Sequence, residues 1–189
     1  MADPAFVTLE DSARLAGHAR WVETRLFAVL GAWVQAEPDP AAKIFWATRS
    51  RRHGNHASGW HQRQPRVAHL DIDALVVPAG TFASEAFDAL GALGGTGHTA
   101  ARLAAVGRVL LPSLVTAYRT WMERAHPLAD TAVVAWARLV VDDEVAACGR
   151  ARELLDGATG PASPAVGDEG LAALLGDDDI LGLPAAWRA

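Results

Sequence analysis

Two histidines three residues apart, His53 and His56, are the first residues whose type and spacing could support chemistry. Positions i and i+3 of a helix share a face, so both imidazoles can converge on one ion, at roughly 2.0–2.1 Å each for zinc. Trp46 and Trp60 fall on the side of His53, which argues against full exposure of that side. The alternative is a solvated basic helix face. His61 is turned away and is predicted to lie at the surface.

Two glutamates, Glu23 and Glu144, fall on apolar stripes and are predicted to point inward. A buried carboxylate is costly unless it is paired, protonated or bound to a metal. One alternative for Glu23 is a salt bridge to an arginine of a neighbouring helix, with Arg52 as the candidate. The alternative for Glu144, with Asp142 and Asp143 beside it, is an acidic surface patch paired with arginines.

Three further features, a tyrosine, a cysteine and a glycine-rich stretch, are weaker candidates for a functional role. Tyr118 is the only tyrosine and is predicted to lie in the core with its hydroxyl hydrogen-bonded, a redox or ligand role being the alternative. Cys148 is the only cysteine, which excludes an internal disulfide, and it is interpreted as a small buried hydrophobe. The glycine-rich stretch 94–98 lacks the lysine of a P-loop and follows no strand, so a plain loop is predicted.

Helical periodicity dominates the apolar pattern and positions these residues. Long helices are predicted over residues 9–36, 41–64, 99–124 and 130–157, with a short extra helix over 83–93. Thr8 followed by Asp11 resembles a capping box at the first helix. Pro112 predicts a kink or break near Leu111 in the third. The fold class is therefore all-α, an antiparallel four-helix bundle.

Composition bounds the domain organisation and the location. The 189 residues, 51 % hydrophobic and 21 % charged, suit one helical domain over residues 1–157. The segment 158–189 is rich in Gly, Pro, Ser and Asp and is predicted to be a linker and flexible tail. It would carry a short helix near 169–175, and its last residues are either disordered or docked. A lone cysteine and an N-terminus unlike a signal peptide favour a cytoplasmic protein.

Net charge and hydropathy argue against two classes of partner, nucleic acids and membranes. The net charge is -5 and no basic stripe runs along any segment, so nucleic acid is not expected. No apolar run approaches the roughly 18 residues of a membrane span, so no membrane is expected either. The remaining candidates are a small-molecule substrate, a second copy of the chain or a related helical subunit.

The arrangement resembles the ferritin-like superfamily, whose four-helix bundles hold two irons or manganeses between helices. In that family a carboxylate on the first helix precedes a Glu-x-x-His on the second by about 30 residues, and helices three and four repeat the pattern. Glu23 lies 30 positions before His53, and His53 with His56 takes the two places of the Glu-x-x-His. Glu144 falls at the fourth-helix glutamate, but Ala147 stands where the second histidine belongs. The third helix offers no acidic ligand near its middle, and the resemblance covers residues 8–157 as architecture.

The resemblance implies a mononuclear or degenerate site for iron or manganese, with Glu23, His53, His56 and Glu144 as ligands. Since related bundles include hydroxylases, oxidases and desaturases, it also implies an oxygen-dependent oxidoreductase with an unknown substrate.

In that enzyme Arg52 would orient a substrate carboxylate or supply charge, and Tyr118 would be a redox neighbour or hydrogen-bond donor. The alternative is a non-catalytic bundle that has lost its metal and binds a partner. Seven tryptophans fit either an interface or a well-filled core. A third hypothesis is a metal-free binder or enzyme that uses the same polar layer for acid–base work.

Overall fold

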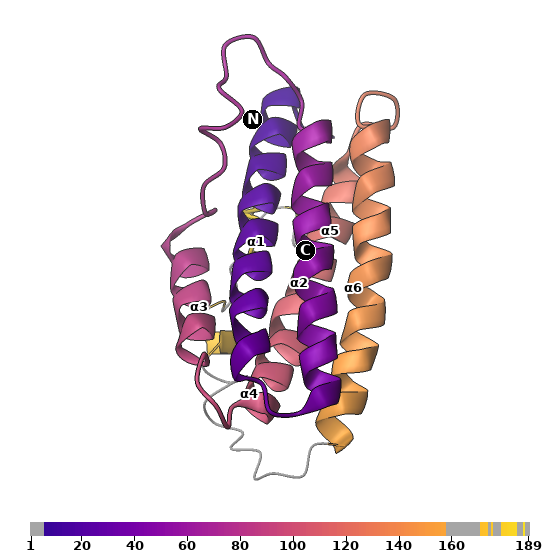
Figure 1. Ribbon diagram of the computed structural model, residues 1–189. Helices are drawn as coiled ribbons and strands as arrows, with labels where there is room; N and C mark the ends of the chain where they lie inside the picture. Colours follow the sequence, from indigo (N-terminus) through magenta and orange to yellow (C-terminus); the bar gives the residue numbers. More distant parts are fainter. Residues whose placement is uncertain (1–5, 158–170, 174, 176–178, 185–186, 188–189) are drawn as a thin grey trace.

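The computed structural model describes residues 6–157, 171–173, 175, 179–184 and 187, and all regular structure in this part of the chain is helical. The all-α prediction is therefore confirmed. The long helices lie side by side, with α3 against the outside of α1 (Figure 1). The elements are α1 (Leu9–Ala36), α2 (Pro40–Arg63), α3 (Thr81–Ala92), α4 (Thr99–Ala104), η1 (Ala105–Leu110), α5 (Leu111–Arg124) and α6 (Thr131–Gly157).

Side-chain caps fix where the first two helices begin. The Thr8 hydroxyl oxygen accepts the backbone N–H of Asp11 at 3.1 Å and its O–H donates to the Asp11 carboxylate at 2.6 Å, as the sequence predicts. The Asp39 carboxylate accepts the N–H of Ala42 at 2.7 Å, and Pro40 occupies the first turn of α2, where no helical donor is lost. Each cap contributes about 1 kcal/mol.

The predicted third helix is interrupted by the π-helix η1, which ends immediately before Leu111. Pro112 follows, and its ring excludes a regular helix because it collides with the carbonyl four residues earlier. The chain responds with a wider turn, in which the N–H of Leu111 donates to the carbonyl of Val106. Gly107 permits close approach to α6, because a Cβ there would lie 2.5 Å from the Cβ of Ala151. The predicted interruption is confirmed, with its form now defined.

One continuous stretch of the described chain, Thr99–Arg124, is long and apolar enough to cross a membrane by length and composition alone. Its most apolar window has a mean hydropathy of 1.4, and 61 % of that window is buried. The core helix of a folded protein passes the same test, and the buried side chains of this stretch pack into the common core. They include Leu103, Val106, Leu110, Leu114, Ala117 and Trp121.

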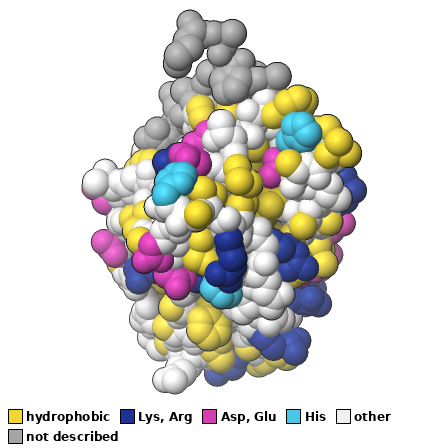
Figure 2. All heavy atoms as spheres, turned by 90° about the horizontal axis from the view of Figure 1, so that it is seen from above, with side chains coloured by type: hydrophobic (Ala, Val, Ile, Leu, Met, Phe, Trp, Pro, Cys, Tyr) yellow, Lys and Arg dark blue, Asp and Glu magenta, His cyan; other side chains and the backbone are white. Residues whose placement is uncertain are grey.

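The end of the molecule seen in Figure 2 carries hydrophobic, basic, acidic and histidine side chains next to one another. This distribution agrees with a modest net charge of -5. Some large apolar side chains are exposed in the structure, among them Phe6, Leu128 and Ile44, with exposed fractions of 43 %, 84 % and 68 %. Isolated exposed hydrophobic residues of this kind are normal on a protein surface.

The described part of the C-terminal tail is docked on the helices. Its apolar side chains are buried, and the backbone carbonyl of Leu181 lies 2.9 Å from Nδ1 of His18 on α1. Of the two alternatives for the end of the chain, the docked one therefore holds at these positions, because burial of several apolar side chains outweighs the entropy of ordering the segment. The predicted linker over 158–168 lies outside the described residues. The buried tail residues are Leu171, Leu175, Ile180, Leu181, Leu183 and Trp187.

A buried ion pair joins the α1–α2 turn to the start of α4. Glu37 and Arg102 are fully buried, with 3.0 Å between Oε2 and Nη1. The Glu37 carboxylate also accepts hydrogen bonds from Trp46 Nε1 at 3.1 Å and the Thr99 hydroxyl at 2.5 Å. Arg102 Nε donates to the carbonyl of Leu93 at 2.8 Å. These contacts clamp one end of the helix assembly.

Replacing Arg102 with methionine is expected to lower the free energy of unfolding by about 3–5 kcal/mol, because Glu37 is left as a buried, uncompensated charge. The matched control is Arg150→Met on α6, which breaks an exposed pair with Glu153 whose side chains are 54 % and 67 % exposed. That change is expected to cost less than about 1 kcal/mol. Urea unfolding followed by circular dichroism measures both, and equal losses would contradict the clamp.

Candidate metal centre

Four potential metal-ligating side chains converge in the core from three helices. Glu23 comes from α1, His53 and His56 come from α2, and Glu144 comes from α6. One ligand atom of each lies within 4.8 Å of the others, and all four residues are buried. The structure therefore brings together the four residues that the sequence singles out.

The ligand atoms face one another in a defined way. Oε2 of Glu23 lies 2.6 Å from Nδ1 of His53 and 3.4 Å from Nδ1 of His56. Oε1 of Glu144 lies 3.6 Å from Nδ1 of His53 and 3.3 Å from Nδ1 of His56. Both imidazoles thus present Nδ1, and each carboxylate presents one oxygen, toward a common centre.

Two of these atoms are buried without a hydrogen bond. Nδ1 of His56 and Oε1 of Glu144 have no partner that meets hydrogen-bond geometry, although they are 3.3 Å apart. An unsatisfied buried polar group costs about 1–3 kcal/mol, so it calls for a specific explanation such as an ion. Two imidazole nitrogens and two carboxylate oxygens suit a first-row transition metal. The residues present therefore fit a metal ion.

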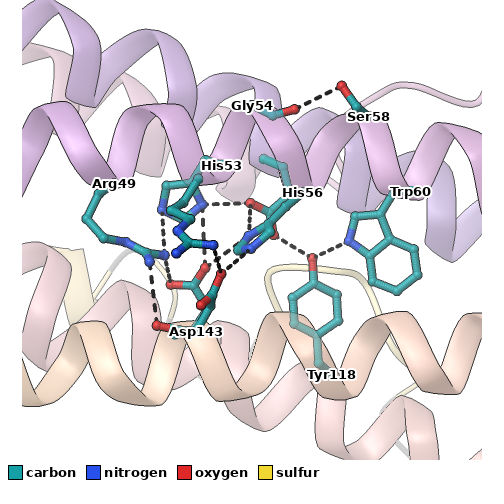
Figure 3. Close-up of polar contacts among 11 residues, drawn as sticks. Arg49, His53, Gly54, His56, Ser58, Trp60, Tyr118 and Asp143 are labelled. Carbon is teal, nitrogen blue, oxygen red and sulfur yellow. Dashed lines mark hydrogen bonds and ion pairs between the residues drawn. The ribbon is translucent and has the colours of Figure 1, made fainter.

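A second set of contacts orients the proposed ligands (Figure 3). Nε2 of His56 lies 3.1 Å from Oδ2 of Asp143, an arrangement that fixes the ring and strengthens a metal-binding imidazole. The Tyr118 hydroxyl donates to Oε1 of Glu23 at 2.9 Å and accepts from Trp60 Nε1 at 3.1 Å. Tyr118 is thus a core tyrosine with its hydroxyl satisfied, in direct contact with a proposed ligand.

Arg49 is the site residue that sequence reasoning misses. It is only 5 % exposed, and its Nη2 lies 2.5 Å from Oε2 of Glu144 and 3.4 Å from Nε2 of His53. The signal for it is positional, because Arg49 precedes His53 by four residues and His56 by seven and so shares their helix face. Arginine on a helix is usually solvated, which hides that signal.

The alternative for Glu23, an ion pair with Arg52, is not formed. Arg52 has a 49 % exposed side chain and approaches Asp143 instead, with 3.5 Å between Nη1 and Oδ2. Arg52 directly precedes His53, so a rotation of roughly 100° per residue carries it off the buried face. The arginine that contacts a glutamate of the cluster is Arg49, through Oε2 of Glu144.

Burial and mutual attraction determine which side chains of the buried Glu–His cluster are charged. Burial opposes the charged form of His56, but attraction to the carboxylates of Glu23 and Glu144 outweighs it and raises its pKa from 6.5 to about 10. Burial likewise opposes ionisation of Glu23, yet His56 and His53 hold its pKa well below the ordinary value. Burial, reinforced by the Glu23 charge, raises the pKa of Tyr118 well above 10.0. The metal-free site therefore contains ionised Glu23, protonated His56 and neutral Tyr118.

Trp136 of α6 is partly buried and packs beside His56. Its indole occupies the space where a Cβ at Gly59 would be, and its ring centroid lies 6.2 Å from that of His56. The Arg63 guanidinium covers the other part of the indole, 4.3 Å from the ring centroid. A cavity of about 610 Å³ lies elsewhere, between α5 and the described tail, and shares no lining residue with the cluster. The candidate site is therefore identified by its buried carboxylates and imidazoles, and not by the size of a cavity.

The stability of the metal-free protein is expected to fall as the pH rises from about 6.5 to about 10, because the folded state binds the His56 proton more tightly than the unfolded chain. This contribution is fully present below 6.5 and absent above about 10. Urea unfolding in the presence of a chelator across this range measures it. His56→Gln removes the proton and should flatten the profile, whereas His61→Gln on the exposed side of α2 should not. Parallel profiles for all three proteins would contradict the assignment.

Comparisons with protein-family models, curated proteins and solved structures find no match to this chain. The resemblance to the ferritin-like superfamily consequently receives no support from a neighbour. What stands on the structure is an all-α fold with a buried Glu–His cluster that could bind a metal ion. Function must be argued from the chemistry of that cluster.

Proposed function

We propose that this protein binds one iron or manganese ion through Glu23, His53, His56 and Glu144. The observation that carries the proposal is the pair of buried atoms without a hydrogen bond, Nδ1 of His56 and Oε1 of Glu144, which lie 3.3 Å apart and face the other two ligand atoms. An ion at that centre would satisfy both atoms and would neutralise the two carboxylates.

The proposed architecture is a ferritin-like antiparallel four-helix bundle. Three of its columns would be α1, α2 and α6, and the fourth would be the continuous run of α4, η1 and α5. The placement of the ligands on facing helices, directed inward, supports this proposal because bundles of this type build metal sites in that way. The site would differ from the usual dinuclear one, because Arg49 lies against the second oxygen of Glu144.

The proposed activity is that of an oxygen-dependent oxidoreductase. A bound iron or manganese ion with two histidines and two carboxylates would retain open coordination positions and supply one-electron chemistry toward dioxygen. The chain's own residues have separate roles. Asp143 orients His56, Trp136 packs against the His56 ring, and the Tyr118 hydroxyl holds a proton at Oε1 of Glu23. The substrate would be a small molecule, and a cytoplasmic location is part of the proposal.

The alternative is a metal-free bundle that binds a second copy of itself or a related helical subunit. The observation favouring it is charge balance, because Arg49 and protonated His56 together offset the charges of Glu23 and Glu144. A layer balanced in this way would hold the helices together without an ion. Exposed apolar side chains on α1, α2 and α6, such as Phe27, Ile44 and Leu139, would then be available to a partner.

Protein purified without a metal-affinity column from iron- and manganese-supplemented medium is expected to contain about one equivalent of these metals. Elemental mass spectrometry on His53→Ala and His56→Ala should find that equivalent lost, since each variant removes a ligand. His61→Ala, on the exposed side of the same helix, is the control and should retain it. A metal-free unchanged protein with normal folding would exclude the metal centre and favour the partner-binding alternative.

The iron-loaded protein is expected to consume dioxygen faster than His53→Ala protein given the same iron, because only the former binds the ion in the helical core. An oxygen electrode measures this under identical buffer and iron concentrations. Equal rates for the two proteins, with iron bound only to the unchanged protein, would leave the metal site intact and exclude the proposed oxygen chemistry.

A further inference from the structure

Arg49 contacts two of the four proposed ligands, although it cannot bind a metal itself. Its Nη2 donates to Oε2 of Glu144 at 2.5 Å and lies 3.4 Å from Nε2 of His53, and its Nη1 donates to the carbonyl of Asp143 at 3.5 Å. The residue is 5 % exposed, and its Nε is buried without a partner. The proposed function gives no role to this guanidinium, which lies next to a proposed cation-binding site.

The Arg49 contact determines which nitrogen of His53 carries the proton. A guanidinium has only donors, so Nε2 of His53 must accept from it. The proton of the neutral ring is then on Nδ1, where it donates to Oε2 of Glu23 at 2.6 Å. Nδ1 is the atom that faces the common centre, so in this arrangement its lone pair is not available to a metal.

Metal binding and the Arg49 contact therefore exclude each other at His53. A metal on Nδ1 would require the ring proton to move to Nε2. Two donors, the Nε2–H of His53 and the Nη2–H of Arg49, would then face each other at the 3.4 Å that separates these nitrogens. The guanidinium would have to leave, and Asp143, which is 27 % exposed at the edge of the layer, offers it a carbonyl and a carboxylate.

The positive charge of Arg49 opposes metal binding, as the His53 tautomer does. Arg49 places a fixed positive charge in contact with a ligand carboxylate, where a buried cation is repelled more strongly than in water. It also occupies one of the two oxygens through which Glu144 would hold a metal. Both effects weaken the binding of a second cation in the same layer.

We propose that Arg49 is a built-in competitor of the metal, which stabilises the metal-free layer and lowers the affinity of the site for a divalent transition-metal ion. The proposal rests on the metal site proposed above. Binding of the ion displaces the guanidinium from His53 toward Asp143 and moves the His53 proton from Nδ1 to Nε2. Loss of the Arg49 charge consequently strengthens metal binding.

Titration of the full chain with Mn²⁺, followed by the loss of the free-ion electron paramagnetic resonance signal, tests the competition. Arg49→Gln is expected to bind Mn²⁺ at least about tenfold more tightly than the unchanged protein, because a buried like charge is removed. Arg51→Gln makes the same charge change at an exposed position of the same helix and is expected to alter affinity by less than about threefold. Arg49→Lys keeps the charge and should stay close to the unchanged protein. Equal or weaker binding by Arg49→Gln overturns the proposal.

The outcomes separate this inference from the proposed function. If the unchanged protein binds Mn²⁺ and Arg49→Gln gains nothing, only the competition fails. If no folded variant binds Mn²⁺, both fail. Tight binding by Arg49→Gln alone would support the competition directly. Nitrogen chemical shifts of the chelator-treated unchanged protein give a test that does not depend on how the variants fold. They should show Nε2 of His53 without a proton, and a protonated Nε2 would overturn the proposal.

Discussion

The structure depends on the neutralisation of two carboxylates that are removed from water in the middle of the helix assembly. Glu23 on α1 and Glu144 on α6 are fully buried, and neither helix supplies its own counter-charge at that level. An isolated buried charge costs a large part of the stability of a typical domain, so a partner has to be present. In the described part of the chain, the basic groups that meet the two carboxylates, Arg49, His53 and His56, all come from α2. Helix α2 therefore connects α1 and α6 through these charged contacts, and the contacts fix how the three helices align.

The spacing on α2 is what permits one helix to serve two neighbours. Arg49, His53, His56 and Trp60 recur at steps of three and four, so they form one buried polar stripe. His53 lies closest to the carboxylate of α1 and Arg49 to that of α6, while His56 lies between both. Trp60 continues the stripe toward Tyr118 of α5, which returns a hydrogen bond to Glu23. All four long segments are therefore joined through a single layer.

Much of this organisation follows from local pattern, and the remainder depends on contacts between distant segments. Apolar periodicity and caps locate the helices closely, and two glutamates on apolar stripes locate the site. Arg49 cannot be assigned in this way, because its burial depends on Glu144, 95 residues later in the chain. Arg52 has the same side chain, and only the helical rotation relative to α6 separates the two. The docking of the tail likewise depends on complementary surfaces that no local pattern encodes.

The same chain contains a second buried polar cluster, formed by Glu37 and Arg102. Comparing its hydrogen bonds with those of the Glu–His layer helps to decide whether that layer has only a structural role. Glu37 and Arg102 are as deeply buried as Glu23 and Glu144, yet their side-chain polar atoms all have hydrogen-bond partners. This is the expected form of a buried ion pair whose role is to hold segments together. In the Glu–His layer, by contrast, an imidazole nitrogen of His56 and a carboxylate oxygen of Glu144 lie 3.3 Å apart without a hydrogen bond. A chain that satisfies one buried cluster in full and leaves ligand atoms open in another has a layer better suited to binding an ion than to packing alone.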